Sequence, residues 1–170
     1  MIRAGVVSDS HGDLRSLEAC MLKAGRVDCW FHLGDFASDA KALAASGRPV
    51  YSVYGNCDGF FGGEAIEDAY PASQKAGSGE RVVTIGGARI LLMHGHRYGV
   101  DLGTLRASYR AEELNCAAVL YGHTHRAELS AFGPVLVLNP GSTSRPRGGG
   151  ASFAVLEVEK GSVNASLIIL

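Results

Sequence analysis

The first 54 residues alternate between short apolar runs and amphipathic stretches, and this alternation narrows the fold more than any other feature. Apolar runs at 2–7, 29–33 and 50–54 are nearly continuous, as in strands covered on both faces. Between them, 14–24 carries apolar residues at helical spacings, and 38–45 is a short alanine-rich stretch. An order of strand, helix, strand, helix, strand predicts a parallel sheet with right-handed crossovers.

The rest of the chain predicts more strands and one helix. Residues 81–85 and 89–93 flank Gly86-Gly87 and predict a hairpin, because such turns need positive φ angles. Residues 102–114 have the apolar spacing of a helix. The glycine-rich stretch 59–79 is expected to be a long surface excursion near the site, either a lid or a plain connection. A strand is predicted at 117–121, and antiparallel segments at 129–132, 135–138, 152–158 and 163–170.

Metal-ligating side chains follow five of the predicted strands. In an open α/β sheet, ligands bind beyond the carboxyl ends of the strands, where these groups are expected. Within the pairs Asp9/His11 and His123/His125, an extended chain would turn both side chains to one side. Carboxylate, amide and imidazole groups are typical ligands of divalent metals. The complete set is Asp9, His11, Asp35, Asn56, His94, His123 and His125.

The order of these short motifs resembles that of the calcineurin-like metallophosphoesterases. The motifs are Asp-x-His, Gly-Asp, Gly-Asn-x-Asp, His-Gly-His and Gly-His-x-His, and the segment 139–142 also resembles the small bacterial and archaeal phosphodiesterase branch. The resemblance covers nearly the whole chain. It implies one metallophosphoesterase domain over 1–170, with the α/β fold of a four-layer α/β/β/α sandwich: two mixed β-sheets flanked by helices.

The same resemblance implies how two divalent metal ions would be shared. One ion would be held by Asp9, His11 and His125, and the other by Asn56, His94 and His123. Asp35 would bridge the two ions. Manganese is the metal expected first, with Fe, Zn, Ni or Mg as alternatives, because the ligand set alone does not select among them.

Two ions about 3.5–4 Å apart would bind the phosphoryl oxygens and activate a shared water. The expected reaction is hydrolysis of a phosphodiester by in-line attack of a metal-bridging hydroxide. Catalytic roles are predicted for Asp35, Asn56, Asp58 and His96. For Asp58, orienting a ligand and a purely local turn role are both open. His32 is expected to be an ordinary hydrogen-bonded histidine.

Cys57 departs from the wider family, in which many relatives carry a histidine that protonates the leaving group. A thiol is a poorer proton donor and cannot carry positive charge. Either His96 or a metal-bound water is expected to serve instead, or the substrates have leaving groups good enough to need no acid. Arginine suits bidentate phosphate binding, although Arg145 and Arg147 could be solvated loop charges. Asn139 is expected to brace a metal-binding histidine. The predicted substrate-binding residues are Asn56, Cys57, His96 and Arg145.

Composition limits the partners and the location. The net charge of −1 offers no broad positive field for a stable nucleic-acid partner. No apolar run reaches the length of a membrane span, and no signal peptide is evident, so a cytoplasmic protein with a small phosphodiester or nucleotide-like substrate is expected. Phe60 and Phe61 could form a homo-oligomer contact or cover the pocket. Cys20, Cys29 and Cys116 are expected to be buried thiols.

Two other functions use the same fold. A phosphomonoesterase would differ in the pocket around Cys57. The chain also resembles the retromer scaffold subunit, a non-catalytic protein with a degraded ligand set. Here all seven ligand positions carry competent residues, which argues against a scaffold.

Overall fold

The computed structural model describes residues 1–58 and 79–170, which form two five-stranded mixed sheets. The first sheet has the order β10-β9-β1-β2-β3, with β1, β2 and β3 parallel and β9 and β10 antiparallel to their neighbours. Its strands are β1 (Ile2–Val7), β2 (Cys29–His32), β3 (Val50–Ser52), β9 (Ser152–Glu159) and β10 (Ser162–Ile169).

The second sheet has the order β4-β5-β6-β8-β7. Strands β5, β6 and β8 are parallel, and β4 and β7 are antiparallel edge strands. The predicted hairpin is confirmed as β4–β5, whereas β8 pairs in parallel with β6 as well as antiparallel with β7. The expectation of purely antiparallel segments was therefore wrong for β8, because this strand inserts between β6 and β7. The bounds are β4 (Glu80–Ile85), β5 (Ala88–Met93), β6 (Ala118–Leu120), β7 (Ala127–Phe132) and β8 (Val135–Pro140).

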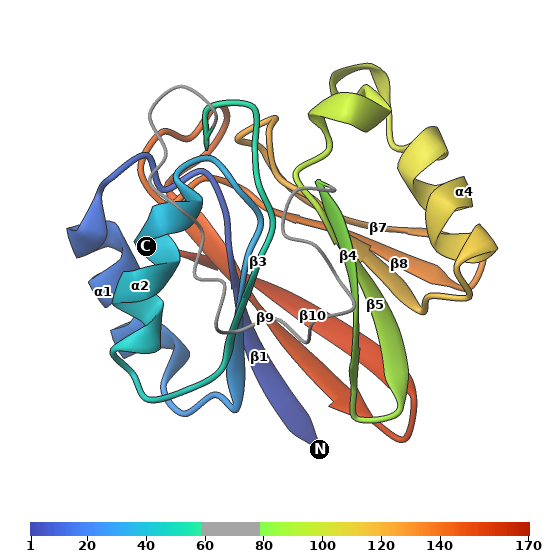
Figure 1. The fold of residues 1–170 in the computed structure, drawn as a ribbon, viewed down its shortest axis with the longest axis horizontal. Coiled ribbons are helices and arrows are strands. Elements are labelled where there is room, and N and C mark those ends of the chain that lie inside the picture. The colour runs from blue at the N-terminus through green and yellow to red at the C-terminus, as the bar shows by residue number, and fades with distance from the viewer. Residues whose placement is uncertain (59–78) are drawn as a thin grey trace.

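Helices cover the outer face of each sheet and complete the predicted four layers (Figure 1). Helices α1 (Leu14–Ala24) and α2 (Ala40–Ala44) lie on the first sheet, and α4 (Leu105–Glu113) lies on the second. Helix α4 begins later than predicted because Gly103 has a φ of 137°, which is not a helical conformation. The short 3₁₀ helices are η1 (Ala37–Asp39), η4 (His96–Tyr98) and η5 (Val100–Leu102).

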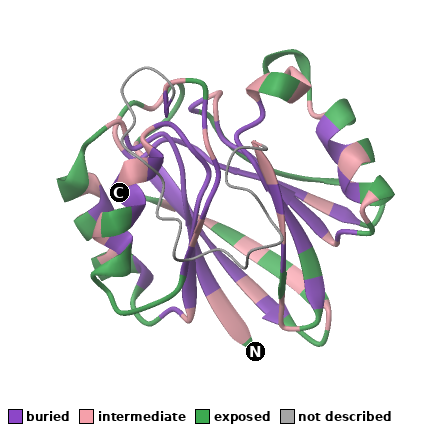
Figure 2. Ribbon diagram, viewed as in Figure 1, coloured by how far each residue is buried: buried purple, intermediate pink, exposed green. Residues whose placement is uncertain are grey.

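The core is divided by the alternation of side chains along the central strands. In β1, Val6 packs between the sheets and Val7 packs under the helices of the first sheet. In β5, Leu92 faces the other sheet and Leu91 faces α4. Both faces of these strands are buried, which explains the continuous apolar runs (Figure 2). The predicted core thiols of Cys20, Cys29 and Cys116 are also buried.

Some expectations concern parts of the chain that the structure does not describe. Most of the predicted excursion 59–79 and both Phe60 and Phe61 lie outside the described residues. Among the helices of residues 1–58 and 79–170, none combines the length and the apolar character that crossing a bilayer requires.

A partly buried ion pair joins α4 to the start of β4. From it we predict that the stability of the protein depends on pH. Arg110 of α4 donates to Glu80 at 2.6 Å, and the Tyr98 hydroxyl donates to the same carboxylate. The Arg110 hydrogen bond holds the pKa of Glu80 below its ordinary value. Because the folded-state pKa is lowered, this stabilisation is present above the ordinary glutamate pKa and is lost as pH falls through the lowered value.

We expect Glu80→Gln to lower the free energy of unfolding by about 1 kcal/mol at pH 7, and by less at acidic pH. Urea unfolding at pH 7 and at a pH below the lowered pKa of Glu80 would measure this difference. Glu113→Gln, which removes the exposed second partner of Arg110, is the matched control and should change little. A Glu80→Gln penalty that does not depend on pH would contradict the assignment.

Candidate metal centre

The predicted ligands lie on loops that follow the carboxyl ends of five parallel strands in the two sheets. Asp9 and His11 follow β1, and Asp35 follows β2. Asn56 follows β3, His94 follows β5, and the loop after β6 carries His123 and His125. Because the parallel strands of both sheets end at the same edge of the sandwich, residues more than a hundred positions apart meet there.

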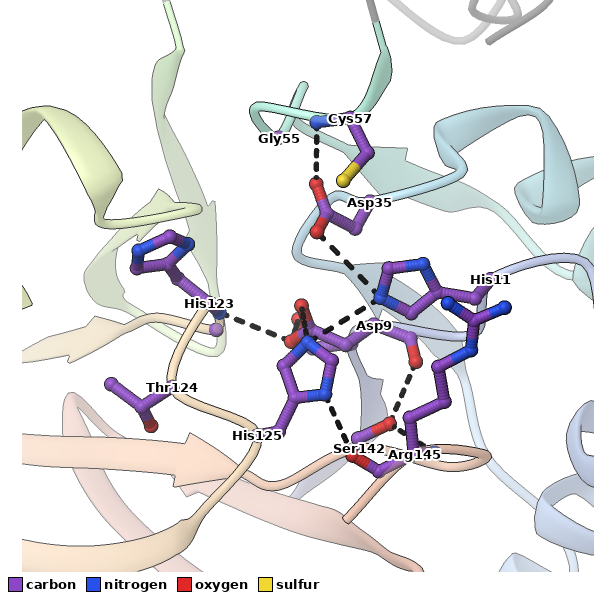
Figure 3. Close-up of polar contacts among 12 residues, drawn as sticks. Asp9, His11, Asp35, Gly55, Cys57, His123, Thr124, His125, Ser142 and Arg145 are labelled. Carbon is purple, nitrogen blue, oxygen red and sulfur yellow. Dashed lines mark hydrogen bonds and ion pairs between the residues drawn. The ribbon is translucent and has the colours of Figure 1, made fainter. Parts of the chain in front are cut away.

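One group of donors consists of Asp9, His11, Asp35 and His125, whose ligand atoms all lie within 4.8 Å of one another (Figure 3). His125 Nε2 lies 3.2 Å from Asp9 Oδ1, and His11 Nε2 lies 3.7 Å from Asp35 Oδ2. Among the described residues, the buried Asp9 Oδ1 has no hydrogen-bond partner. A buried carboxylate oxygen without a donor is costly, and a cation at this position would satisfy it.

A second group forms around the side-chain oxygen of Asn56. This oxygen lies 2.9 Å from His123 Nδ1 and 3.1 Å from His94 Nε2. Asp35 Oδ1 lies 3.3 Å from the same His94 nitrogen, whereas Asp35 Oδ2 faces His11 of the first group. The structure thus brings all seven predicted ligand residues together, with the two oxygens of one carboxylate directed to different groups.

Contacts behind the site fix the orientation of three histidines. His94 Nδ1 lies 2.8 Å from the carbonyl oxygen of Leu33, and His125 Nδ1 lies 2.7 Å from that of Arg145. A carbonyl oxygen only accepts, so these Nδ1 atoms donate and each Nε2 keeps a lone pair for a metal. His123 is reversed, since its Nε2 lies 2.8 Å from Asp101 Oδ2 and its Nδ1 points to the site. Sequence reasoning missed Asp101, which belongs to none of the motifs.

An extended chain was expected at the ligand pairs, and the structure shows turns there instead. Most of the predicted ligands have left-handed backbone angles. Such angles are uncommon for residues other than glycine and concentrate at functional sites. The two side chains of each Asp-x-His or His-x-His pair share a side through these turns and not through strand alternation. The φ angles are 53° at Asp9, 47° at His11, 55° at Asp35, 69° at His123 and 59° at His125.

Two glycines let the loops approach one another. A Cβ on Gly122 would lie 2.0 Å from Ser8 Oγ and 2.8 Å from Asp9 Oδ2. Gly34 has a φ of 97°, and a Cβ there would lie 2.6 Å from the backbone nitrogen of Gly55. Any side chain at these positions would push the ligand loops apart.

A fully buried network holds the turn between Asp9 and His11. Ser10 Oγ donates to Asp39 Oδ2 at 2.7 Å and lies 2.9 Å from His32 Nε2. The Gly34 N–H donates to His32 Nδ1, so His32 Nε2 carries the proton that Ser10 accepts. Burial lowers the pKa of His32, which keeps the ring neutral. His32 is therefore an internal hydrogen-bonding residue, as expected.

Asp58 also supports the site from behind. Its carboxylate accepts hydrogen bonds from the backbone N–H groups of Gly55 at 2.6 Å, Ala37 at 2.6 Å and Asp35 at 3.1 Å. It is buried and does not line the cavity of the site. These contacts join the loops that carry Asn56 and Asp35, so Asp58 holds these two loops in position. Asn139 braces the histidine loop in the same way, donating to Gly122 O and Thr124 Oγ1 at 3.0 Å each.

The metal centre opens into a cavity of about 360 Å³. Cys57 and Arg145, both predicted to bind substrate, line it together with several ligands. Burial raises the pKa of the Cys57 thiol to about 11, so the thiol stays protonated. His96 is not part of the described lining, although its ring centroid lies 5.4 Å from that of His94. The described residues of the lining are His11, Asp35, Asn56, Cys57, His123, His125, Arg145 and Arg147.

A four-layer sandwich with Asp, Asn and His ligands at one edge defines a metallophosphoesterase architecture. The sequence model of the calcineurin-like phosphoesterase superfamily domain matches residues 2–161, and the chain belongs to that superfamily. The chain is 33% identical to the probable metallophosphoesterase YsnB of Bacillus subtilis strain 168, over 91% of this chain and 83% of YsnB. It is 31% identical to the phosphodiesterase YfcE of Escherichia coli K12, over 97% of this chain and 92% of YfcE.

Solved structures share the architecture. A predicted phosphoesterase from Streptococcus pneumoniae TIGR4 matches with a TM-score of 0.76 and 29% identity, covering 99% of this chain and 89% of that chain. A Vps29 variant from Entamoeba histolytica matches with a TM-score of 0.73 and 22% identity, covering 99% of both chains. At this identity the Vps29 likeness shows the fold alone.

Proposed function

We propose that this chain is a dinuclear metal-dependent phosphodiesterase that hydrolyses small or nucleotide-like phosphodiesters. The observation that carries the proposal is the placement of Asp35, whose Oδ2 faces His11 and whose Oδ1 faces His94. One carboxylate directed to two groups of donors suits a bridge between two ions. Relatives named as phosphodiesterases, such as YfcE, support the diester class.

The donor set fits divalent metals, with manganese proposed first. Asp9, His11 and His125 would hold one ion, and Asn56, His94 and His123 the other. When bound, such ions supply Lewis-acid stabilisation of phosphoryl oxygens and lower the pKa of a coordinated water. The protein contributes the fixed positions of the donors, because the outer nitrogens of the three histidines are already held.

The other residues of the cavity bind and orient the phosphate. Arg145 is exposed at the cavity and presents a guanidinium that suits a phosphoryl group. Cys57 N–H donates to Asp35 Oδ1 at 2.9 Å, so this position holds the proposed bridge through its backbone. The Cys57 thiol cannot supply a positive charge to the leaving group.

The leaving group therefore departs with little help from Cys57. The rate should rise steeply as the pKa of the leaving alcohol falls. A role for His96 as proton donor remains a prediction, tested by His96→Ala with a series of aryl diesters. A flat dependence on leaving-group pKa, with an undiminished rate in His96→Ala, would contradict this reading.

The proposal extends to the setting of the enzyme. We propose a cytoplasmic enzyme that works on a small substrate without a stable nucleic-acid or membrane partner, in keeping with its net charge of −1. A homo-oligomer is compatible with this function.

The test is hydrolysis of bis(p-nitrophenyl) phosphate and of p-nitrophenyl phosphate by metal-stripped protein, with Mn²⁺, Mg²⁺ or Zn²⁺ restored singly. We expect Mn²⁺-dependent cleavage of the diester in preference to the monoester. Metal binding should also raise the free energy of unfolding, by about 2.7 kcal/mol at a hundredfold excess over the dissociation constant. Faster monoester cleavage would favour the phosphomonoesterase. Two bound ions per chain without turnover would favour the scaffold.

A further inference from the structure

A second hollow adjoins the cavity of the metal centre. It has a volume of about 540 Å³ and is lined by residues 100–104 together with Thr124, Arg126, Glu128 and Arg147. Arg147 lines both hollows. Thr124 and His123 are neighbours on one loop, with Thr124 facing the second hollow and His123 the metal centre. A ligand seated at the metal centre could therefore extend past Arg147 into this space.

Within residues 1–58 and 79–170, the cationic side chains of this hollow have no polar partner, whereas the anionic ones are hydrogen-bonded. Arg126 and Arg147 are exposed, and neither guanidinium forms a hydrogen bond or ion pair with a described residue. Asp101 Oδ2 is held by His123 Nε2 at 2.8 Å. Glu128 accepts from the Tyr121 hydroxyl at 2.7 Å and from Ser130 Oγ at 3.2 Å. The groups left to recognise a ligand are thus the two guanidinium forks, which match phosphate oxygens.

We infer that this hollow binds a second phosphoryl group of the substrate, so that the preferred substrate is a diester bearing a further phosphate on one of its ester groups. This inference rests on the proposed function and names its substrate class. The cavity of the metal centre is lined mainly by the proposed ligands. The scissile phosphate would therefore occupy this cavity, and one of its ester groups would extend out of it. Arg147 would lie between the two phosphoryl groups, and Arg126 would contact only the second.

The test compares thymidine 5′-(p-nitrophenyl phosphate) with the same compound carrying a 3′-phosphate. We expect the 3′-phosphate to raise kcat/KM by about tenfold or more, mainly by lowering KM. The reason is that hydrogen bonds between charged groups are stronger than those between neutral groups. Arg126→Gln should remove most of this advantage while leaving hydrolysis of bis(p-nitrophenyl) phosphate unchanged. The advantage should also fall with added salt, since both guanidinium groups are exposed.

Arg48→Gln is the matched control, because Arg48 is an exposed arginine before β3, at the opposite end of that strand from Asn56. It removes the same charge and should keep the full advantage of the 3′-phosphate. Equal kcat/KM for both nucleotides in the unaltered protein, or equal losses in Arg126→Gln and Arg48→Gln, would overturn the inference.

Direct binding separates this inference from the proposed function. Calorimetric titration with thymidine 3′,5′-bisphosphate and with thymidine 5′-phosphate needs no turnover. We expect the unaltered protein to bind the bisphosphate about tenfold more tightly than the 5′-phosphate. The Arg126→Gln variant should bind the two nucleotides equally. Absence of hydrolysis with every metal would overturn the proposed phosphodiesterase, whereas equal affinities for the two nucleotides would overturn the second phosphate site.

Discussion

Asp35→Asn should lower kcat/KM for diester hydrolysis by about 100-fold to 1000-fold or more, while the protein stays folded. Asparagine offers one oxygen and one NH₂ group, and the NH₂ group would face either His11 or His94 in place of a charged oxygen. Asparagine tolerates the left-handed backbone at this position, where φ is 55°, so the loop should persist. Steady-state kinetics with Mn²⁺, together with the metal content per chain, would measure the effect.

The matched control is Asp13→Asn, which alters an exposed carboxylate at the start of α1. Asp13 accepts a hydrogen bond from the Ser16 N–H as the helix cap, and asparagine caps a helix about as well. This variant should keep full activity and metal content. If Asp35→Asn retained kcat/KM within a few-fold of the unaltered protein, Asp35 could not be the shared ligand.

Asp58→Ala should lower the free energy of unfolding by about 3 kcal/mol or more, even without metal. The substitution leaves three backbone N–H groups, those of Asp35, Ala37 and Gly55, without their acceptor in a buried region. The two loops that Asp58 joins should separate, and metal affinity should fall as a consequence. Urea unfolding of the metal-free protein and a metal titration would measure the two effects separately.

Asp58→Asn provides the graded comparison. Its one oxygen can still accept the bonds from Asp35 and Gly55, whereas its NH₂ group would face the Ala37 N–H. An intermediate loss of stability is expected. A variant Asp58→Ala that is inactive but as stable as the unaltered protein, with normal metal affinity, would contradict this supporting role and favour a catalytic one.

The sequence predicted correctly those elements whose residue pattern lies within one short segment. Strands β1, β2 and β5 are apolar on both faces, so each appears in the sequence as a run followed by its ligand. The hairpin β4–β5 was predicted in the same way from its two glycines. The order of the polar motifs then identified the superfamily that residues 2–161 match.

The features that escaped prediction depend on contacts between distant segments. The left-handed turns at Asp9 and His11 replace an extended strand because Ser10 is held by His32 and Asp39, from the next strand and helix. Asp101 follows β5 and His123 follows β6, so their contact depends on the parallel pairing of these two strands. Strand β8 lies between β6 and β7, although β7 comes before it in the chain, and no local pattern records this insertion.

The pairing of β1 with β9 has a consequence for how the molecule is made. Ile2 lies opposite Val158, so one side of the central strand is completed by a segment far along the chain from it. A chain growing on the ribosome therefore exposes one edge of β1 until β9 has been made, and such an edge is open to wrong pairing. The metal-ligand group that contains Asp9 is likewise incomplete until His125 has been made. Products of early termination would carry an unprotected strand edge together with an incomplete set of metal ligands.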